Sequence, residues 1–270
     1  MTYSSTSPST GPGSPEVFGF YDDDTGSIQY LVADPETAKA ALVDVVLGFD
    51  PESAATHSAG ADAILSFASS EGFEIEWILD THPHADHLMA SSVLKDRIGK
   101  PNAIGEKVKE IAELWRDYYN MPDAFDPARD FDRLFADGDE FQIGNLPVRV
   151  MLTPGHTLGS ITYVVGDDAA FVHDTFMQPD VGTSRADFPG GSAGKLYDSL
   201  QAILSLPDRT SGTITAAIFA KRPTGFRPWP NSAATTPISA AAWRRRSTSR
   251  PGKAGTRPWP CPTGCCTFCR

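Results

Sequence analysis

The amino-acid sequence predicts an α/β fold, and the order of its expected elements is consistent with two β-sheets between helices. Short apolar runs with strand-like alternation interleave with amphipathic helical segments over residues 17–206. Histidine and acidic residues directly follow several of the expected strands, which places their side chains at one edge of a sheet. A chain of 270 residues is also long enough to bury the core of one large domain.

The first part of the chain alternates expected strands with a single helix. Residues 17–32 have the pattern of a hairpin around the glycine-containing turn at residues 22–26. Residues 41–47 form a third apolar strand, and the apolar run at residues 75–79 forms a fourth. Between them, residues 59–70 show helical spacing of their apolar side chains and end near a glycine.

The second part of the chain continues this alternation. Helices with one apolar face are expected over residues 88–98, 106–119 and 196–206. Short strands are expected over residues 102–104, 141–150, 161–165 and 169–172, with a loop over residues 121–130.

The most informative motif is Thr-His-Pro-His-Ala-Asp-His at residues 81–87. Neutral imidazole and carboxylate groups are the side chains that hold Zn, Fe or Mn in proteins. A chance cluster in a polar turn is disfavoured, because four of the six histidines of the chain fall within residues 57–87. The spacing therefore predicts a metal site on the loop beyond the strand at residues 75–79, with these candidate residues: His82, His84, Asp86 and His87.

Two later segments add candidate ligands. The strand-like residues 148–153 run into Pro-Gly-His-Thr, which contains His156, and the apolar run at residues 169–172 is followed by His173 and Asp174. The order His-x-His-x-Asp-His, Pro-Gly-His-Thr and strand-end Asp resembles the metallo-β-lactamase fold. This resemblance implies a four-layer αββα sandwich of the metallo-β-lactamase type, with an incomplete or irregular C-terminal part.

The resemblance implies two alternative metal arrangements. In a dinuclear site, three histidines would hold one ion, and an aspartate, a loop histidine and a later histidine would hold the other, with Asp174 as the bridge. The sequence has no histidine beyond His173, so this set is incomplete in the chain. The remaining members of the dinuclear set would be His82, His84, His156, Asp86 and His87.

The mononuclear alternative is implied by the persulfide dioxygenase branch of the fold. That branch holds one Fe(II) per chain with residues that correspond here to His82, His156 and Asp174. Two histidines and one carboxylate leave positions open for a thiolate substrate and O₂. Zinc is the alternative metal.

Catalytic groups are expected among the polar residues beside these ligands. His84 and Asp86 would orient the ligands or move protons, and together with His87 they are also possible additional ligands. Arg185 would steady an anionic thiol near the site. Its alternative role is an ion pair with Asp187 or another nearby carboxylate that holds the loop.

One further stretch and three further positions bear on the branch of the family or on the site. The stretch Gly-Thr-Ser-Arg-Ala-Asp-Phe at residues 182–188 and the serine at Ser160 resemble the persulfide dioxygenases, whereas glyoxalase II relatives carry Gly-Cys-Gly-Arg and His there. His173 departs from the family, which usually has Gly before the ligand Asp. It is either a spare imidazole near the metal or a product of local sequence change. Tyr197 faces either the substrate or the core.

The two ends of the chain differ in composition from the predicted domain at residues 17–209. Residues 1–16 are rich in Ser, Thr, Pro and Gly and are expected to be disordered. All 34 acidic residues precede Thr210, whereas residues 210–270 contain ten Lys and Arg, no acid and all four cysteines. We interpret this basic tail as the product of a frameshift. The alternative is an appendage that binds nucleic acid or a second metal.

The sequence favours a mononuclear non-haem iron dioxygenase that oxidises glutathione persulfide, or a similar low-molecular-weight persulfide, to sulfite with O₂. One alternative is a metal-dependent hydrolase of the glyoxalase II or lactamase-like type, acting on a thioester or lactam. An alternative of another class is an inactive, partly folded product of a frameshifted gene.

The expected partners are a small-molecule thiol or persulfide and O₂, with a homodimer left open. No nucleic-acid partner is expected. No membrane partner is expected either, since no apolar stretch approaches the 18 residues that a membrane span needs. A cytoplasmic location is the expectation for an N-terminus without the basic start and apolar core of a signal peptide.

Overall fold

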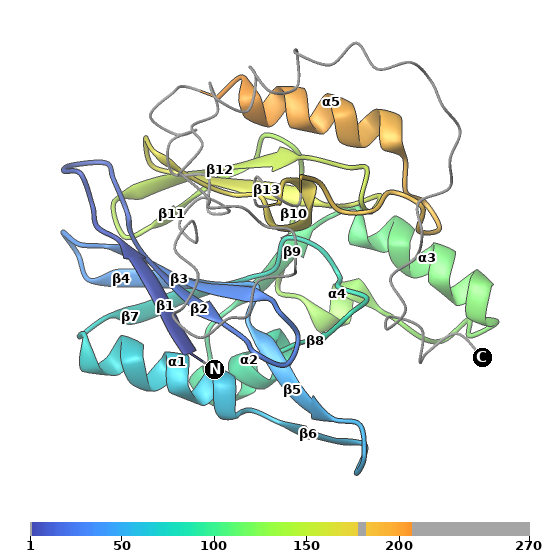
Figure 1. Ribbon diagram of the computed structural model, residues 1–270, viewed down its shortest axis with the longest axis horizontal. Coiled ribbons are helices and arrows are strands. Elements are labelled where there is room, and N and C mark those ends of the chain that lie inside the picture. Colours follow the sequence, from blue (N-terminus) through green and yellow to red (C-terminus); the bar gives the residue numbers. More distant parts are fainter. Residues whose placement is uncertain (1, 178–181, 207–270) are drawn as a thin grey trace, which may run out of the picture.

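Two β-sheets lie face to face in the middle of the domain, and helices cover their outer faces (Figure 1). The structure is a computed structural model and describes residues 2–177 and 182–206. Helices α1 (Ala59–Ser70) and α2 (Ser91–Ile98) lie on one side of the sandwich, and α5 (Ala193–Leu204) lies on the other. The predicted four-layer αββα architecture is therefore confirmed.

The larger sheet contains seven strands in the order β1-β2-β3-β4-β7-β9-β10. Its first four strands pair antiparallel, whereas β4, β7, β9 and β10 run parallel to one another. The carboxyl ends of these parallel strands consequently meet at one edge of the sheet. The strands are Thr2–Ser7 (β1), Glu16–Tyr21 (β2), Ile28–Asp34 (β3), Lys39–Val43 (β4), Glu74–Leu79 (β7), Asn102–Gly105 (β9) and Arg133–Phe135 (β10).

The second sheet contains four antiparallel strands in the order β11-β12-β13-β14. Its strands are Glu140–Ile143 (β11), Leu146–Leu152 (β12), Ile161–Val165 (β13) and Ala169–Phe171 (β14). A small sheet contains Ala55–His57 (β6), Val46–Asp50 (β5) and Leu88–Met89 (β8). The other helical segments are Val108–Tyr119 (α3), Pro127–Asp130 (α4) and the 3₁₀ turn His173–Thr175 (η1).

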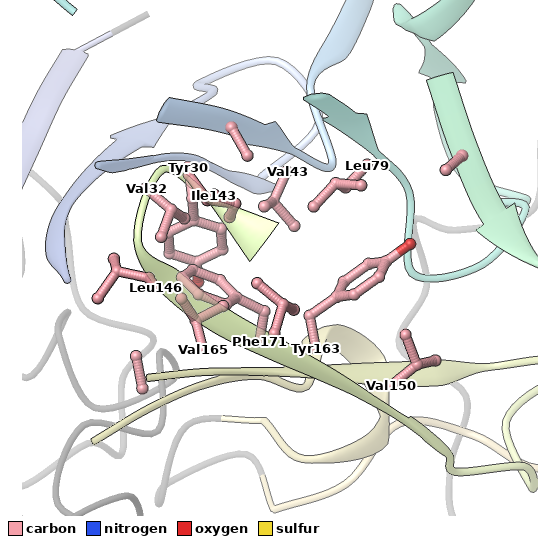
Figure 2. Close-up of a cluster of buried hydrophobic side chains, with 14 of the residues drawn as sticks. Tyr30, Val32, Val43, Leu79, Ile143, Leu146, Val150, Tyr163, Val165 and Phe171 are labelled. Carbon is pink, nitrogen blue, oxygen red and sulfur yellow. The ribbon is translucent and has the colours of Figure 1, made fainter. Parts of the chain in front are cut away.

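Alternate residues of each strand point into different layers, because successive side chains of a strand lie on opposite faces. Tyr30 and Val32 of β3 pack between the two sheets in a core that includes Tyr163 of β13 (Figure 2). Leu31, which lies between them in sequence, belongs instead to the core under α1 that includes Ile64. Strand β3 therefore contributes side chains to the cores on both faces of the larger sheet.

The fourth layer, α5, packs on the outer face of the second sheet. Val164 of β13 and Ala170 of β14 share a core with Leu196, Leu200 and Ile203 of α5. Full burial of an aliphatic side chain contributes about 1.5–3 kcal/mol relative to exposure. These contacts hold α5 against the loops at the edge of the second sheet.

Two predicted elements near the first sheet have different boundaries. The strand expected over residues 41–47 is two strands, β4 and β5, because Asp44 takes a φ of 51° and turns the chain between them. The helix expected over residues 88–98 begins only at Ser91, since residues 88–89 pair with β5 as strand β8.

Further differences lie in the middle of the chain. The single strand expected over residues 141–150 is a hairpin whose turn contains Gly144, at a φ of 57°. The loop expected over residues 121–130 contains the short helix α4, and β10 was not predicted. Both of these elements are too short to carry a clear period in the sequence.

The prediction that residues 1–16 are disordered is wrong for the part that the structure describes. Residues 2–7 form β1, which pairs antiparallel with β2. The hydroxyl groups of Thr10 and Ser14 both donate to Oδ2 of Asp168 at 2.9 Å. The composition of this segment indicated a chain with little apolar surface, but its backbone and hydroxyl groups have distant partners that composition does not reveal.

The predicted aberrant tail at residues 210–270 lies outside the described residues. Within residues 2–177 and 182–206, no helix combines the length and the apolar composition that a membrane crossing requires.

Candidate metal centre

The candidate ligands come together at one edge of the sandwich, although they are far apart in sequence. The loop after β7 carries His82 and His84, and the loop between β12 and β13 carries His156. The turn η1, directly after β14, carries His173 and Asp174. Both sheets therefore contribute to one site.

Asp174 is the residue at which the two contributions meet. Its Oδ2 atom lies 3.5 Å from Nε2 of His82 and 3.3 Å from Nε2 of His156. The two imidazole rings are 5.0 Å apart and perpendicular. The structure thus brings together two imidazole nitrogens and one carboxylate oxygen, which is the donor set of mononuclear non-haem iron sites. The role of these three residues as metal ligands stays a prediction.

Hydrogen bonds to the second nitrogen of each ring set the orientation of both histidines. Nδ1 of His156 lies 2.8 Å from the backbone carbonyl of Arg185, to which its N–H donates. Nδ1 of His82 lies 3.1 Å from the hydroxyl of Thr81. In this tautomer each Nε2 atom carries the free lone pair that ligation of a metal by imidazole requires, and both atoms lie within 3.5 Å of Oδ2 of Asp174.

Asp44, at the turn after β4, is a site residue that the sequence analysis missed. It is buried, and its carboxylate accepts hydrogen bonds from the backbone N–H of Thr81 at 2.8 Å and from the Thr81 hydroxyl at 3.0 Å. Its Oδ1 also lies 3.4 Å from Nε2 of His84. The signal in the sequence was an acid inside the apolar run at residues 41–47.

The surroundings of Asp44 favour the ionised form of its carboxylate. Burial alone would raise its pKa, but the charge of His173 and the hydrogen bond from His84 hold it well below its ordinary value. The buried carboxylate of Asp44 therefore anchors the loop after β7, which carries His82 and His84, through charge-assisted hydrogen bonds.

Four buried ring nitrogens at the site have no hydrogen-bond partner among the described residues: Nε2 of His82, Nδ1 of His84 and both nitrogens of His87. Buried polar atoms are nearly always satisfied in folded proteins. Burial lowers the pKa of all three imidazoles, which favours the neutral form that binds metal ions. The residues present therefore fit a metal ion.

The donor atoms form two overlapping groups, within each of which all atoms lie within 4.8 Å of one another. The first group contains His82, His84, His173 and Asp174, and the second contains His84, Asp86 and His87. His84 belongs to both groups, and its ring stacks on that of His87 with centroids 4.1 Å apart.

His173 adopts a backbone conformation that favours glycine, with a φ of 34°. A non-glycine residue in such a region costs of order 1–3 kcal/mol. Glycine would adopt this conformation without that strain. The ring lies inside the site, where Nδ1 is 3.0 Å from Oδ1 of Asp174.

The charges around His173 and Asp174 favour a cation within the donor cluster. Burial opposes ionisation of His173, but the charge of Asp44, the hydrogen bond and charge of Asp174 and the charge of Asp86 raise its pKa to about 9. Burial would likewise raise the pKa of Asp174, yet the hydrogen bond from His173 and the charge of that imidazole hold it far below its usual range. The site therefore contains ionised carboxylates that attract positive charge.

The side chains of three other residues named from the sequence make contacts outside the donor cluster or are exposed. The guanidinium of Arg185 pairs with Asp187 through two contacts of 2.6 and 2.8 Å and lies over the ring of Phe188. This is the ion pair given above as the alternative, and the catalytic role of Arg185 stays a prediction. Tyr197 is 62% exposed and so does not face the core. Ser160 is buried, and its hydroxyl is 2.8 Å from that of Thr157.

Gly155 allows α5 to approach the loop that carries His156. Its φ is 139°, and a Cβ atom at this position would lie 2.3 Å from the backbone of Leu196 in α5. The helix is held to the same loop by hydrogen bonds from Ser199 to the carbonyl of Pro154 at 2.7 Å and from Ser192 to that of Gly155 at 2.8 Å.

We expect Gly155→Ala to destabilise the protein far more than Gly11→Ala. Gly11 has a similar φ of 134°, but a Cβ there would meet nothing within 4 Å. Both variants lose about 1–3 kcal/mol to backbone strain, and Gly155→Ala loses about 1–3 kcal/mol more to overpacking. Urea denaturation measures the difference, and equal losses would show that the contact with α5 is not needed.

We expect Asp44→Asn to weaken metal binding by about 10–100-fold while the protein stays folded, because the loop loses a charged acceptor that orients two histidines. Asparagine has the same size and tolerates a positive φ. Competition with a chelator measures the affinity, and the exposed Asp96→Asn serves as control. An unchanged affinity in Asp44→Asn would contradict the anchoring role.

Comparison with known proteins identifies the family. The sequence model of the metallo-beta-lactamase superfamily matches residues 24–211. A beta-lactamase hydrolase-like protein of Xylella fastidiosa is 56% identical over 196 residues, which cover 73% of this chain and 45% of that protein. A probable metallo-hydrolase of Burkholderia pseudomallei is 44% identical over 204 residues, which cover 72% of this chain and 69% of that protein.

Solved structures agree with this assignment. ETHE1 from Myxococcus xanthus has a TM-score of 0.55 and 30% identity, and the match covers 71% of each chain. The chain spans about half the length of the Xylella relative, so the similarity concerns this domain and not that whole protein. On the family match and the shared fold, the chain belongs to the metallo-beta-lactamase superfamily.

Proposed function

We propose that this chain is a mononuclear non-haem iron dioxygenase that oxidises a low-molecular-weight persulfide, with glutathione persulfide as the favoured substrate, to sulfite. The observation that carries the proposal is the convergence of His82, His156 and Asp174, with both Nε2 atoms within 3.5 Å of one carboxylate oxygen. Two histidines and one carboxylate are the ligand set of non-haem Fe(II) oxygenases.

The stretch that resembles persulfide dioxygenases supports this choice, because it contacts a proposed ligand. The carbonyl of Arg185 accepts the hydrogen bond from His156 at 2.8 Å. The ring of Phe188 lies edge-on to the imidazole of His156, with centroids 5.4 Å apart. Residues 182–188 therefore orient one ligand directly.

The proposed reaction converts a persulfide, RSSH, with O₂ and H₂O into the thiol RSH, sulfite and two protons. The S–S bond breaks, the terminal sulfur is oxidised, and O₂ is the oxidant. A bound iron ion supplies the one-electron and O₂ chemistry that side chains lack. His84 has Nε2 3.4 Å from Asp44, its Nδ1 has no partner among the described residues, and in this proposal it would accept the proton of the persulfide at Nδ1.

Metal-dependent hydrolysis of a thioester or lactam is the second candidate function. The donor group of His84, Asp86 and His87 favours it, because it lies beside the first group and provides ligands for a second ion. The names of the Xylella and Burkholderia relatives point in the same direction. Hydrolysis of a glutathione thioester by zinc-loaded protein, without O₂ uptake on persulfide, would favour this function.

We expect anaerobically purified protein to contain about one iron per chain and to consume O₂ when glutathione persulfide is added. The reason is that the donor atoms around Asp174 form one complete set for a single iron. Metal analysis and an oxygen electrode measure the two quantities. Two tightly bound zinc ions per chain would contradict the proposal.

We expect Asp174→Ala to abolish O₂ consumption and iron binding, whereas His84→Ala lowers the activity by about 10–100-fold and keeps most of the iron. The contrast follows from ligation by Asp174 and proton transfer by His84. Asp96→Ala, on the exposed side of α2, is the control and should match the wild type. Equal loss of iron from Asp174→Ala and His84→Ala would place His84 among the ligands.

A further inference from the structure

The imidazole of His173 lies among the proposed ligands, although the family resemblance gives it no role. Its ring centroid is 4.5 Å from that of His84 and 5.5 Å from that of His82. The side chain is only 11% exposed. It therefore lies inside the donor cluster and not on the surface beside it.

The two oxygens of Asp174 face different partners. Oδ2 faces Nε2 of His82 and of His156, at 3.5 and 3.3 Å. Oδ1 faces Nδ1 of His173, at 3.0 Å. His173 therefore contacts the oxygen of Asp174 that faces neither His82 nor His156.

The spacing of the donor atoms suits a shared ion. Those of His82, His84, His173 and Asp174 all lie within 4.8 Å of one another, and His156 joins this group through Asp174, whose Oδ2 lies 3.3 Å from its Nε2. Ligands bonded at about 2.1 Å on opposite sides of an ion are about 4.2 Å apart, which is close to the spacing of this group. Nε2 of His82 is buried and has no hydrogen-bond partner among the described residues.

The strained backbone at His173 indicates that its imidazole has a function. A φ of 34° is uncommon for residues other than glycine, which would adopt it without strain. Strained residues of this kind concentrate at functional sites, where the surrounding structure holds them in place. Here the neighbouring carboxylate and two imidazole rings surround the strained residue.

We propose that His173 is a further protein ligand of the metal ion, so that this chain holds the ion with three histidines, His82, His156 and His173, and with Asp174. Four protein ligands leave two positions of a six-coordinate ion free, which is the number that one sulfur ligand and O₂ need. This inference rests on the proposed metal centre but not on the oxidation of a persulfide.

The test is binding of Co(II) to the full chain, measured by chelator competition and by the visible absorption spectrum of the bound ion. His173→Gly and His173→Asn both accept a positive φ, so the backbone is kept while the imidazole is lost. The control is His57→Asn, which replaces an exposed histidine of β6. Circular dichroism checks that each variant is folded.

If His173 is a ligand, both variants at this position bind Co(II) at least about tenfold more weakly than the wild type, and the absorption spectrum of the bound ion changes. Free imidazole added to His173→Gly should restore the wild-type spectrum, because the small side chain leaves space for it. His57→Asn should bind as the wild type does.

Unchanged Co(II) affinity and spectrum in the folded His173 variants would overturn the inference. So would weaker binding in His173→Gly that free imidazole does not restore, together with normal binding in His173→Asn, since this would indicate a change of loop structure. Wild-type protein that binds Co(II) through His173 but consumes no O₂ with persulfide would refute the proposed function and leave the ligand in place.

Discussion

The buried carboxylate of Asp44 fixes the loop on which the candidate metal centre depends. Pairing of β4 with β7 brings it there, and its own N–H donates to the carbonyl of Leu79 at 2.9 Å. It then accepts from the backbone and hydroxyl of Thr81, and this hydroxyl in turn lies against His82. Since hydrogen bonds to a charged acceptor are stronger than neutral ones, one buried charge holds the start of the loop and the rotation of its first histidine.

The second sheet is tied to the same loop by hydrogen bonds that begin in the apolar core. Tyr163, fully buried between the sheets, donates its hydroxyl to the carbonyl of Asp80 at 3.0 Å (Figure 2). The N–H of Ile161 donates to the carbonyl of Thr81, also at 3.0 Å. Because β13 begins where the loop of His156 ends, these bonds set the separation of His156 from His82. The packing of the core therefore determines the geometry of the site.

Strand periodicity predicted the alternation of strands and helices, whereas the four layers and the convergence of His82, His156 and Asp174 were implied by the resemblance that the ligand motifs carry. The role of Asp44 could not be predicted, because the apolar run at residues 41–47 reads as one strand and the turn within it depends on partners 35 or more residues away. The ordered N-terminal segment was missed for a similar reason. Its polar composition indicated disorder, whereas the acceptor that it needs is Asp168, more than 150 residues later.

The distribution of charge explains why such a site requires a cation at all. The pKa values of Asp44 and Asp174 lie below their ordinary range although both carboxylates are largely buried, and a buried negative charge is costly unless positive charge lies close by. The charges of both carboxylates also raise the pKa of His173, whose Nδ1 lies 3.0 Å from Oδ1 of Asp174. A divalent ion at this site would supply a larger positive charge and satisfy the histidine nitrogens that have no partner among the described residues. Binding energy gained in this way adds to the stability of the folded chain, so the metal and the fold support each other.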